Sequence, residues 1–589
     1  MKATKITSLI LAIMLVALSA ATLIVLPASA DSWDGSAVAT AFSGGKGTEA
    51  EPYLIGSAAE LAYLSASHAE IKAEGETQPV YYKLTSDINL QNNLWTPIGT
   101  SKSENPFTGV FDGDNHTISG LNVELAIEGS GSVSAGLFGG ANGAVIKNVR
   151  VTGSKCLGTY SGPILAYGQN GCKVINCYTK IDRVDGFGVG AVVGRMEATA
   201  GNSEIIGCVS DSNLVLNSYN SKKDIFAGGI VGVAGGCNIA YCASNSNITL
   251  DRTLADDDYS KATLMGGIIG CQGAVSTPTN VRYCYSTGTI TGYTAAAKPT
   301  AGFAGGIVGR AGHVADGKIE NSFSAAKIIW TATKDATETT TDDQGHFGSI
   351  VGQIRKTVTF KDCYALSDHF VGSDEGAAPT DTAVFTALTE EQMKGSEALK
   401  NMNLRVTAAQ LRDAALADAL ANPNYYESEL KAMEDFTDGK TLAEYMTAFV
   451  AANYTLPVDG EIWTTTPGEL PTISNPELAY QLEHLYADVT AMVEAEFKVL
   501  DAKAKAAATT TEEEPDDTPT NTGIVPGTPG DTGSSALPSN GSDTKPNSPS
   551  TNTTQPESGC AGCGGFTALA ALATLLVGSA AFVVVKKKF

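Results

Sequence analysis

Seven short segments of this 589-residue chain share one pattern, in which two adjacent apolar residues are enclosed by small residues. They are AGLFG at 135–139, SGPIL at 161–165, GAVVG at 190–194, GGIVG at 228–232, GGIIG at 266–270, GGIVG at 305–309 and GSIVG at 348–352. Their spacing of about 27 to about 43 residues is typical of stacked structural repeats. This repetition constrains the fold more than any other feature of the sequence.

A second register of residues follows each of these segments. Its reference positions are Val149, Cys177, Cys208, Cys242, Cys284, Ser322 and Cys363. Three residues earlier every repeat has an apolar residue: Ile146, Val174, Ile205, Ile239, Val281, Ile319 or Phe360. Six residues later four repeats have Leu214, Ile248, Ile290 and Ile328, whereas the first two have Lys155 and Arg183. The two registers together predict several short strands in each repeat.

A coil of short strands explains both registers. One repeat cannot bury its apolar side chains alone, but stacking places each strand about 4.8 Å from its counterpart and closes a continuous core. Glycine allows the sharp turns at the corners, and polar segments such as 255–261 and 332–344 are expected to project as loops. We therefore predict an all-β fold, a right-handed parallel β-helix over residues 31–403, with the repeats at about 134–368.

Several motifs resemble the GLUG motif of bacterial cell-surface proteins. They are the GGIVG segments followed by Asn176-Cys177-Tyr178 or Asn321-Ser322-Phe323, and the flanking segments at 47–55, 82–90, 107–118, 387–393 and 462–471. The resemblance covers about residues 47–400 and 461–473. It implies an adhesin-like parallel β-helix on the cell surface, and it says almost nothing about activity.

The region after the repeats reads as helical and then as unstructured. Residues 404–460 are predicted to be a helical insertion that caps the coil, 461–475 a closing strand segment, and 476–508 a helix that begins at Asn475-Pro476. This helix is either a coiled-coil stalk or a helix lying on the β-helix. Residues 509–559 are rich in Thr, Pro, Ser and Gly, which predicts a disordered linker.

Both ends of the chain carry export signals. Residues 1–30 have a basic start, an apolar run and Ala28-Ser29-Ala30, which predicts a cleaved signal peptide, with an uncleaved anchor as the alternative. Residues 560–589 contain Cys560, Cys563 and an uncharged stretch from Phe566 to Val585, followed by three lysines. We expect a single transmembrane helix with a cytoplasmic C-terminus and an extracellular N-terminal region.

Composition excludes one class of partner and leaves catalysis without a motif. The net charge of −24 disfavours nucleic acid, which requires clustered Lys and Arg. Paired carboxylates at glycosidase spacing, the motifs of pectin hydrolases and a Ser-His-Asp pattern do not stand out. His116 reads as a turn hydrogen-bonder, and His313 and His346 are isolated. We expect no enzyme activity, no catalytic residue and no cofactor.

The cysteines read as structural residues. Cys177, Cys208, Cys242, Cys284, Ser322 and Cys363 would form a ladder of small buried side chains. Ser322 and Val149 replace cysteine at this position without an obvious compensating partner. Side chains in register point the same way, which is poor disulfide geometry. Local disulfides between Cys172 and Cys177 or between Cys237 and Cys242 are the alternative, and a zinc site is less favoured because the spacing is wrong.

Candidate ligand contacts lie in or near the projecting segments. The aromatic candidates are Tyr219, Tyr259, Tyr293 and Trp330, because aromatic rings stack on sugars and partner proteins. Asp256, Asp257 and Asp258 are weak calcium candidates, and otherwise no metal site is expected. These residues favour a membrane-anchored module that binds a host or environmental glycan or a surface protein. A carbohydrate-active lyase or hydrolase and a structural envelope component are the alternatives.

Overall fold

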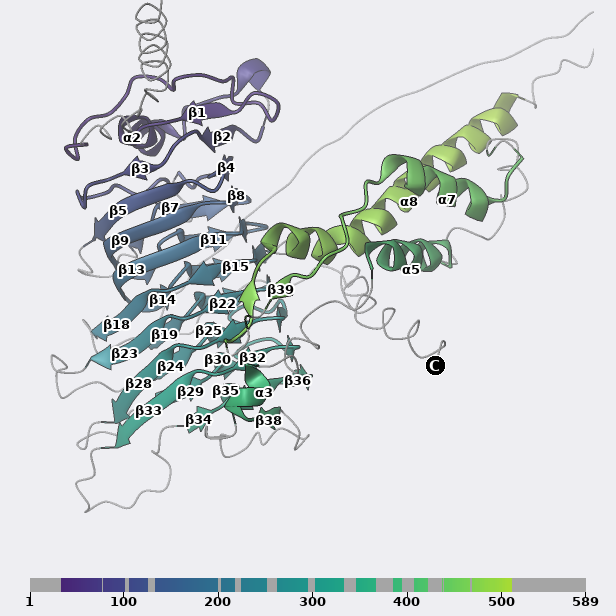
Figure 1. Ribbon diagram of the computed structural model, residues 1–589. Coiled ribbons are helices and arrows are strands. Elements are labelled where there is room, and N and C mark those ends of the chain that lie inside the picture. Colours follow the sequence, from purple (N-terminus) through teal and green to yellow (C-terminus); the bar gives the residue numbers. More distant parts are fainter. Residues whose placement is uncertain are drawn as a thin grey trace, which may run out of the picture. The chain divides into compact units, whose positions relative to one another are not determined.

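Each of the seven repeats forms one coil of a solenoid built from four parallel sheets, A to D (Figure 1). The computed structural model describes residues 33–76, 78–100, 105–125, 133–199, 203–217, 224–251, 262–294, 302–332, 346–366, 385–394, 407–421, 437, 439–464, 466 and 469–510. Within a repeat the chain passes through sheets D, C, A and B in that order. The predicted solenoid of parallel strands is confirmed.

Sheets D and C hold the glycine-enclosed apolar segments. Sheet D comprises β6 (Ser134–Ala135), β10 (Tyr160–Ser161), β14 (Gly188–Gly190), β19 (Ile225–Gly228), β24 (Thr263–Gly266), β29 (Gly302–Gly305) and β34 (His346–Gly348). Sheet C comprises β7 (Phe138–Asn142), β11 (Leu165–Gln169), β15 (Val193–Glu197), β20 (Val231–Gly235), β25 (Ile269–Gln272), β30 (Val308–Ala311) and β35 (Val351–Ile354).

Sheets A and B complete each coil and extend the stack toward the N-terminus. Sheet A comprises β1 (Tyr53–Ile55), β2 (Tyr81–Leu84), β4 (Val110–Asp112), β8 (Val145–Lys147), β12 (Lys173–Ile175), β16 (Ser203–Ile206), β21 (Cys237–Ala240), β26 (Thr279–Arg282), β31 (Gly317–Glu320) and β36 (Val358–Lys361). Sheet B comprises β3 (Ile88–Asn89), β5 (Thr117–Glu124), β9 (Arg150–Leu157), β13 (Tyr178–Asp185), β17 (Val209–Ser210), β18 (Asn213–Asn217), β22 (Ala243–Ser244), β23 (Asn247–Asp251), β27 (Tyr285–Ser286), β28 (Thr289–Thr294), β32 (Phe323–Ser324), β33 (Lys327–Ala332), β37 (Tyr364–Leu366) and β38 (Thr386–Leu388).

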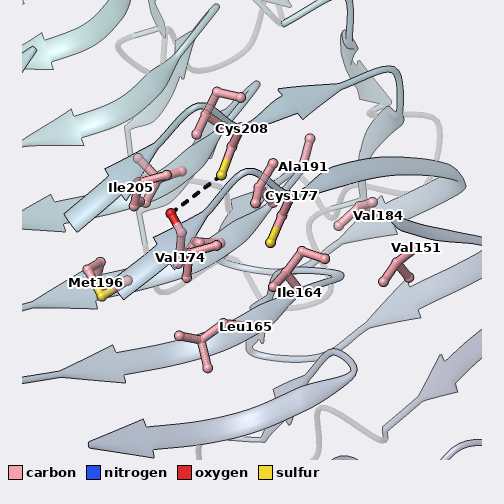
Figure 2. Packing of buried hydrophobic residues seen from close by; sticks show 14 of the residues in the cluster. Val151, Ile164, Leu165, Val174, Cys177, Val184, Ala191, Met196, Ile205 and Cys208 are labelled. Atoms are coloured by element: carbon pink, nitrogen blue, oxygen red, sulfur yellow. Dashed lines mark hydrogen bonds between the residues drawn. The ribbon is translucent and has the colours of Figure 1, made fainter. Parts of the chain in front are cut away.

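The repeat positions meet in the interior of the coil (Figure 2). Val174 pairs with Ile205 in sheet A, and Leu214 pairs with Ile248 in sheet B. The corner between sheets D and C requires a glycine. A Cβ on Gly229 would lie 2.1 Å from the Ser244 Oγ, and the Ser210 Oγ donates to the Gly229 carbonyl at 2.5 Å. Glycine is therefore needed here because a serine from sheet B fills the corner.

An N-terminal helix and short caps flank the solenoid. Helix α2 (Ala58–Ser67) begins at Ser57, whose side chain accepts from the Glu60 amide, and its buried Leu61 and Leu64 join the core of the coils. The 3₁₀ turn η1 (Glu74–Glu76) follows it. Helix α3 (Glu390–Met393) has a capping box between Thr389 and Gln392.

A closing segment, residues 462–484, packs on the outside of the solenoid. It contains the antiparallel pair β39 (Trp463–Thr464) and β40 (Thr472–Ile473) and the first turns of helix α8 (Pro476–Thr510). Its residues Ile462, Trp463, Leu478 and Ala479 form one buried cluster with Ile206, Ala240, Tyr241, Ala243, Tyr285, Phe323, Leu388 and Met393. Because the neighbouring Ile205 and Ile239 face the interior, this cluster lies on the outer surface of sheet A and the start of sheet B.

The remaining helices belong to a second compact unit, Ala409–Leu456 with Leu485–Phe589. Here α5 (Ala408–Leu420) and α7 (Leu442–Asn453) occur where helices were expected, and α8 continues. The Tyr445 hydroxyl, on α7, donates to Glu496 of α8 at 2.8 Å, so the two helices are joined by a hydrogen bond within this unit. The capping role predicted for the insertion stays a prediction.

The predicted signal peptide and anchor lie outside the described residues, as does the predicted linker from residue 511 on. The first two residues assigned to the linker, Thr509 and Thr510, belong to helix α8. Within the described part of the chain, no helix combines the length and apolar character needed to cross a bilayer. Residues 566–585, to which the transmembrane prediction refers, are not among those described.

Candidate ligand-binding face

Four consecutive coils carry their long connections at the same edge of the solenoid, which we call the loop edge. These connections are 218–224, 252–262, 295–301 and 333–345, and each joins the end of a sheet B strand to the start of the next sheet D strand. The strand ends of β18, β23, β28 and β33 lie in a row along this edge (Figure 1). By contrast, the two preceding coils close at this point with only Gly158-Thr159 and Gly186-Phe187.

The four aromatic candidates belong to this edge by their place in the chain. Tyr219 and Tyr259 fall in its connections and lie outside the described residues, as do Asp256, Asp257 and Asp258. Tyr293 and Trp330 lie in neighbouring strands, β28 and β33, where Gly292 pairs with Trp330. The structure therefore brings the backbone positions of Tyr293 and Trp330 together.

A cluster of polar and aromatic side chains on sheets D and C was not predicted from the sequence. We call it the Arg195 cluster; it consists of Tyr160, Tyr167, Arg195 and Glu197 on β10, β11 and β15. The Arg195 Nε donates to Glu197 Oε1 at 2.7 Å, and the Tyr167 hydroxyl donates to Glu197 Oε2 at 2.5 Å. The Arg195 guanidinium carbon lies 5.4 Å from the Tyr160 ring centroid and 5.8 Å from that of Tyr167.

Strand pairing accounts for the Arg195 cluster. Tyr167 and Arg195 are direct partners on β11 and β15, and Tyr160 pairs with Gly188 on β14. A Cβ on Gly188 would lie 2.7 Å from the Tyr160 ring, so glycine leaves room for that ring to lean across the neighbouring strand. The two tyrosine rings meet edge to face, with centroids 5.2 Å apart.

The electrostatics of the cluster favour a charged Arg195. Burial opposes the charge of Arg195, but Tyr160 and Glu197 outweigh it and raise the pKa of the guanidinium. Burial, reinforced by Glu197, also raises the pKa of Tyr167, which stays a neutral donor. The side chains of Arg195 and Glu197 remain 24% and 12% exposed. The cluster can therefore present fixed donors, acceptors and an aromatic ring to solvent.

The ladder of cysteines is buried, and its thiols cap backbone carbonyl groups. The Cys208 thiol lies 3.5 Å from the carbonyl oxygen of Val174 in the preceding coil (Figure 2). Cys242 makes the same contact to Ile205 at 3.5 Å, and Cys363 to Ile319 at 3.3 Å. Burial raises the pKa of the thiols of Cys177 and Cys242, and that of Cys363 to about 12. The thiols of Cys177, Cys242 and Cys363 are therefore poor nucleophiles and act as weak donors.

Ser322 takes the place of cysteine in this ladder. Its hydroxyl donates to the Glu320 carbonyl at 2.9 Å and accepts from the Cys284 amide at 3.2 Å. Cysteines of other coils make the same contact to the carbonyl two residues earlier, as Cys242 does to Ala240 at 3.3 Å. All nine cysteines of the described residues are free, including Cys172 and Cys237, so the alternative of local disulfides is not observed there.

The closing segment carries a buried ionic network that sequence reasoning also missed. Glu204 on β16 lies 2.8 Å from the His484 Nε2 and 3.0 Å from the Lys173 Nζ. Burial opposes the charges, yet Glu204 raises the pKa of His484, and His484 with Lys173 lowers the pKa of Glu204. Beside it Glu483 accepts from Asn238 at 2.9 Å and pairs with Arg282.

The remaining candidate residues are placed as follows. His116 lies 3.2 Å from Asp87 in a turn, as a hydrogen-bonding residue. His313 is half-buried, and burial, together with Arg310 and Arg355, lowers its pKa. His346 begins β34. No group of three metal-ligating side chains occurs among the residues for which the structure gives positions.

Comparisons with known proteins give limited likenesses. No family model matches the chain. Halomucin from Haloquadratum walsbyi (strain DSM 16790 / HBSQ001) is 36% identical over 138 residues, which make up 22% of this chain and 1% of halomucin. The chain therefore matches only a very small part of this curated relative.

Two solved structures resemble this chain with the same TM-score. A “putative immunoglobulin A1 protease” from Bacteroides ovatus is 19% identical with a TM-score of 0.34, covering 61% of this chain and 90% of that chain. An IgA1 protease is 16% identical with a TM-score of 0.34, covering 50% of this chain and 21% of that chain. At such low TM-scores neither likeness carries an argument about fold or activity.

Proposed function

We propose that this chain is a non-catalytic surface module of the GLUG-motif kind, which binds a glycan or a surface protein through the loop edge of a right-handed β-helix. The proposal includes export by the N-terminal signal and retention by the C-terminal apolar segment, with the β-helix outside the cell. An adhesin-like role follows from this arrangement.

The observation that carries the proposal is the distribution of connections along the solenoid. Long connections occur at one edge of four consecutive coils, while the two coils before them close with two residues each. At the other corners of these four coils the connections are shorter, with six residues at 273–278 as the longest. A rigid scaffold with variable loops on one edge is the usual way in which repeat proteins build a binding surface.

Shortening one connection tests the proposal. Residues 252–262 are replaced by Gly-Phe, the connection that the chain itself uses at 186–187, and binding to a glycan array and to a panel of surface proteins is measured. We expect an unchanged thermal midpoint and a loss of binding of at least about tenfold, or 1.4 kcal/mol. In a matched control the short connection Gly186-Phe187 is changed to the sequence Gly-Thr, which the chain uses at 158–159. This change should leave binding unchanged.

The other function classes are outcomes of the same experiment. Release of shortened products from a bound polysaccharide would contradict the non-catalytic proposal and favour a lyase or hydrolase. Ordered self-assembly of the full chain without any bound ligand would favour a structural envelope component. Retention of a ligand without turnover, sensitive to the shortened connection, supports the binding module.

A further inference from the structure

We infer that the Arg195 cluster is a subsite for a neutral oligosaccharide, with Tyr160 as the stacking platform and Arg195 and Glu197 as hydroxyl-binding groups. This inference rests on the proposed binding function and names the ligand class of one part of that surface. It concerns residues outside the long connections, so that it can fail while the binding function stands.

The polar groups of the cluster are fixed in place but not exhausted. The guanidinium of Arg195 has five N–H groups, and the described contacts use one for Tyr160 and two for Glu197. Each oxygen of Glu197 already accepts from Arg195 or Tyr167 and, as a carboxylate oxygen, can accept again. Adjacent sugar hydroxyls both donate and accept, which is the combination that this pair offers.

The cluster stays open at the point where the short connections end. Arg195 pairs with Val233 in the next strand of sheet C. In the coils that follow, the paired position is occupied by Cys271, Arg310 and Gln353. Those four residues are buried, whereas Arg195 and Tyr160 are partly exposed. The cluster therefore lies where the outward position of sheet C changes from partly exposed, at Arg195, to buried in the following coils.

The charge of the protein selects against an anionic ligand. The chain has a net charge of −24, and within the cluster Arg195 is already paired with Glu197. A polyanion would meet general repulsion and no surplus cation. A neutral sugar requires only the partly exposed face of Tyr160 for stacking and the two oriented polar groups.

The experiment uses the full chain and two variants of the cluster. Tyr160→Ala removes the platform, and Arg195→Lys keeps the charge but removes the planar fork of donors. A matched control is Tyr178→Ala, which removes the ring beneath Arg150, 4.3 Å away, in a comparable pair on sheet B. Titration calorimetry with the neutral oligosaccharides that bind the wild type on an array gives the affinities, and thermal melts check folding.

We expect each cluster variant to lose at least about tenfold in affinity, with a melting midpoint close to that of the wild type, while Tyr178→Ala binds normally. Unchanged affinity in both cluster variants, with loss in the variant shortened at 252–262, would overturn the subsite and leave the binding function standing. Binding of acidic oligosaccharides alone would also overturn it. If the wild type binds no glycan and no surface protein, the proposed function fails with it.

Discussion

The turn between sheets A and B is built in two ways along the same solenoid. In the earlier coils it uses Asn115, Asn148 and Asn176, in two later coils it uses Tyr241 and Tyr283, and in the last two it uses Asn321 and Asp362. The backbone is nearly the same, with positive φ values from 50° to 65° in the first three asparagines and 53° in both tyrosines. Asparagine adopts this left-handed conformation readily, whereas a bulky residue does so at a cost.

What covers the turn explains the difference. The asparagines form a ladder, in which the Asn176 amide donates to Asn148 at 2.8 Å and Asn148 donates to Asp112 at 3.0 Å. The Tyr241 and Tyr283 rings instead stack 4.8 Å apart, and Tyr241 is buried in the cluster formed by the closing segment. The fold requires a left-handed backbone conformation at this turn. Packing of the closing segment over the turn decides which side chain is found there.

The largest expected effect tests whether the closing segment is the cover. Trp463 is fully buried and lies 5.1 Å from the Tyr285 ring, which itself stacks on Phe323. Trp463→Ala should lower the free energy of unfolding of the β-helix by about 3–5 kcal/mol, as for other buried aromatic truncations. Urea unfolding followed by circular dichroism measures it. The exposed Val458→Ala is the control, and a loss as small as that of the control would contradict the packing.

The next test compares the two forms of the turn directly. Tyr241→Gly and Asn176→Gly both leave a residue that tolerates positive φ. The first removes a buried ring and should cost about 3 kcal/mol of unfolding free energy. The second removes the partly exposed ladder hydrogen bonds that Asn176 donates to Asn148 and Asn115, and it should cost about 1 kcal/mol. Equal losses of unfolding free energy in the same urea assay would mean that the closing segment does not distinguish the two forms of the turn.

Gly207 marks the boundary between the two forms and gives a smaller effect. Its φ is +66°, and a Cβ there would lie 2.9 Å from the Pro476 Cβ. Gly171 has a φ of +84° with nothing within 4 Å of its added Cβ, so Gly171→Ala reports backbone strain alone. We expect Gly207→Ala to destabilise by about 1 kcal/mol more than that control. The difference between the two melting midpoints would vanish if Pro476 were not packed there.

The smallest effect is the pH dependence of the closing segment. The raised pKa of His484 gives stability that is present below the ordinary value of 6.5 and is lost as the pH rises through the folded-state value. The lowered pKa of Glu204 gives stability that is present above 4.5 and is lost as the pH falls through its folded-state value. The contact is therefore strongest between these two limits.

Replacing the histidine isolates this contribution. The wild type should lose stability as the pH rises above 6.5, with Lys173 and Tyr480 as the other groups near the pair. His484→Gln should lack that slope, measured from melting midpoints across the range. A variant with the same slope as the wild type would assign the pH dependence to another group.

The repeats made the coil predictable from sequence because each position recurs in the same environment. Val174, Ile205 and Ile239 stand three residues before a Cys, and the structure places them in neighbouring strands of sheet A. The caps at Thr389 and Thr441 and the start of α8 at Pro476 were equally accessible, because capping depends on residues adjacent in sequence. The predicted end of that helix, at 508, lies two residues before the observed Thr510.

The closing segment and the Arg195 cluster depend on contacts between distant residues. One signal for the closing segment was present: at the outward position of sheet A, Ile175, Ile206 and Ala240 are apolar between the charged Lys147 and Arg282. An apolar run on an outward face indicates a covering partner. The Arg195 cluster had no such signal, because connections of unequal length hide which residues of successive repeats are paired.

Hydrogen exchange at the turn amides tests the central claim, that the closing segment covers the middle coils, most directly. The amides of Gly207, Tyr241 and Tyr283 each donate to a carbonyl of the next coil, as do those of Asn115, Asn148 and Asn176. In Trp463→Ala we expect the first three to lose protection while the last three keep theirs. Equal changes at all six amides, or none at any, would contradict the account.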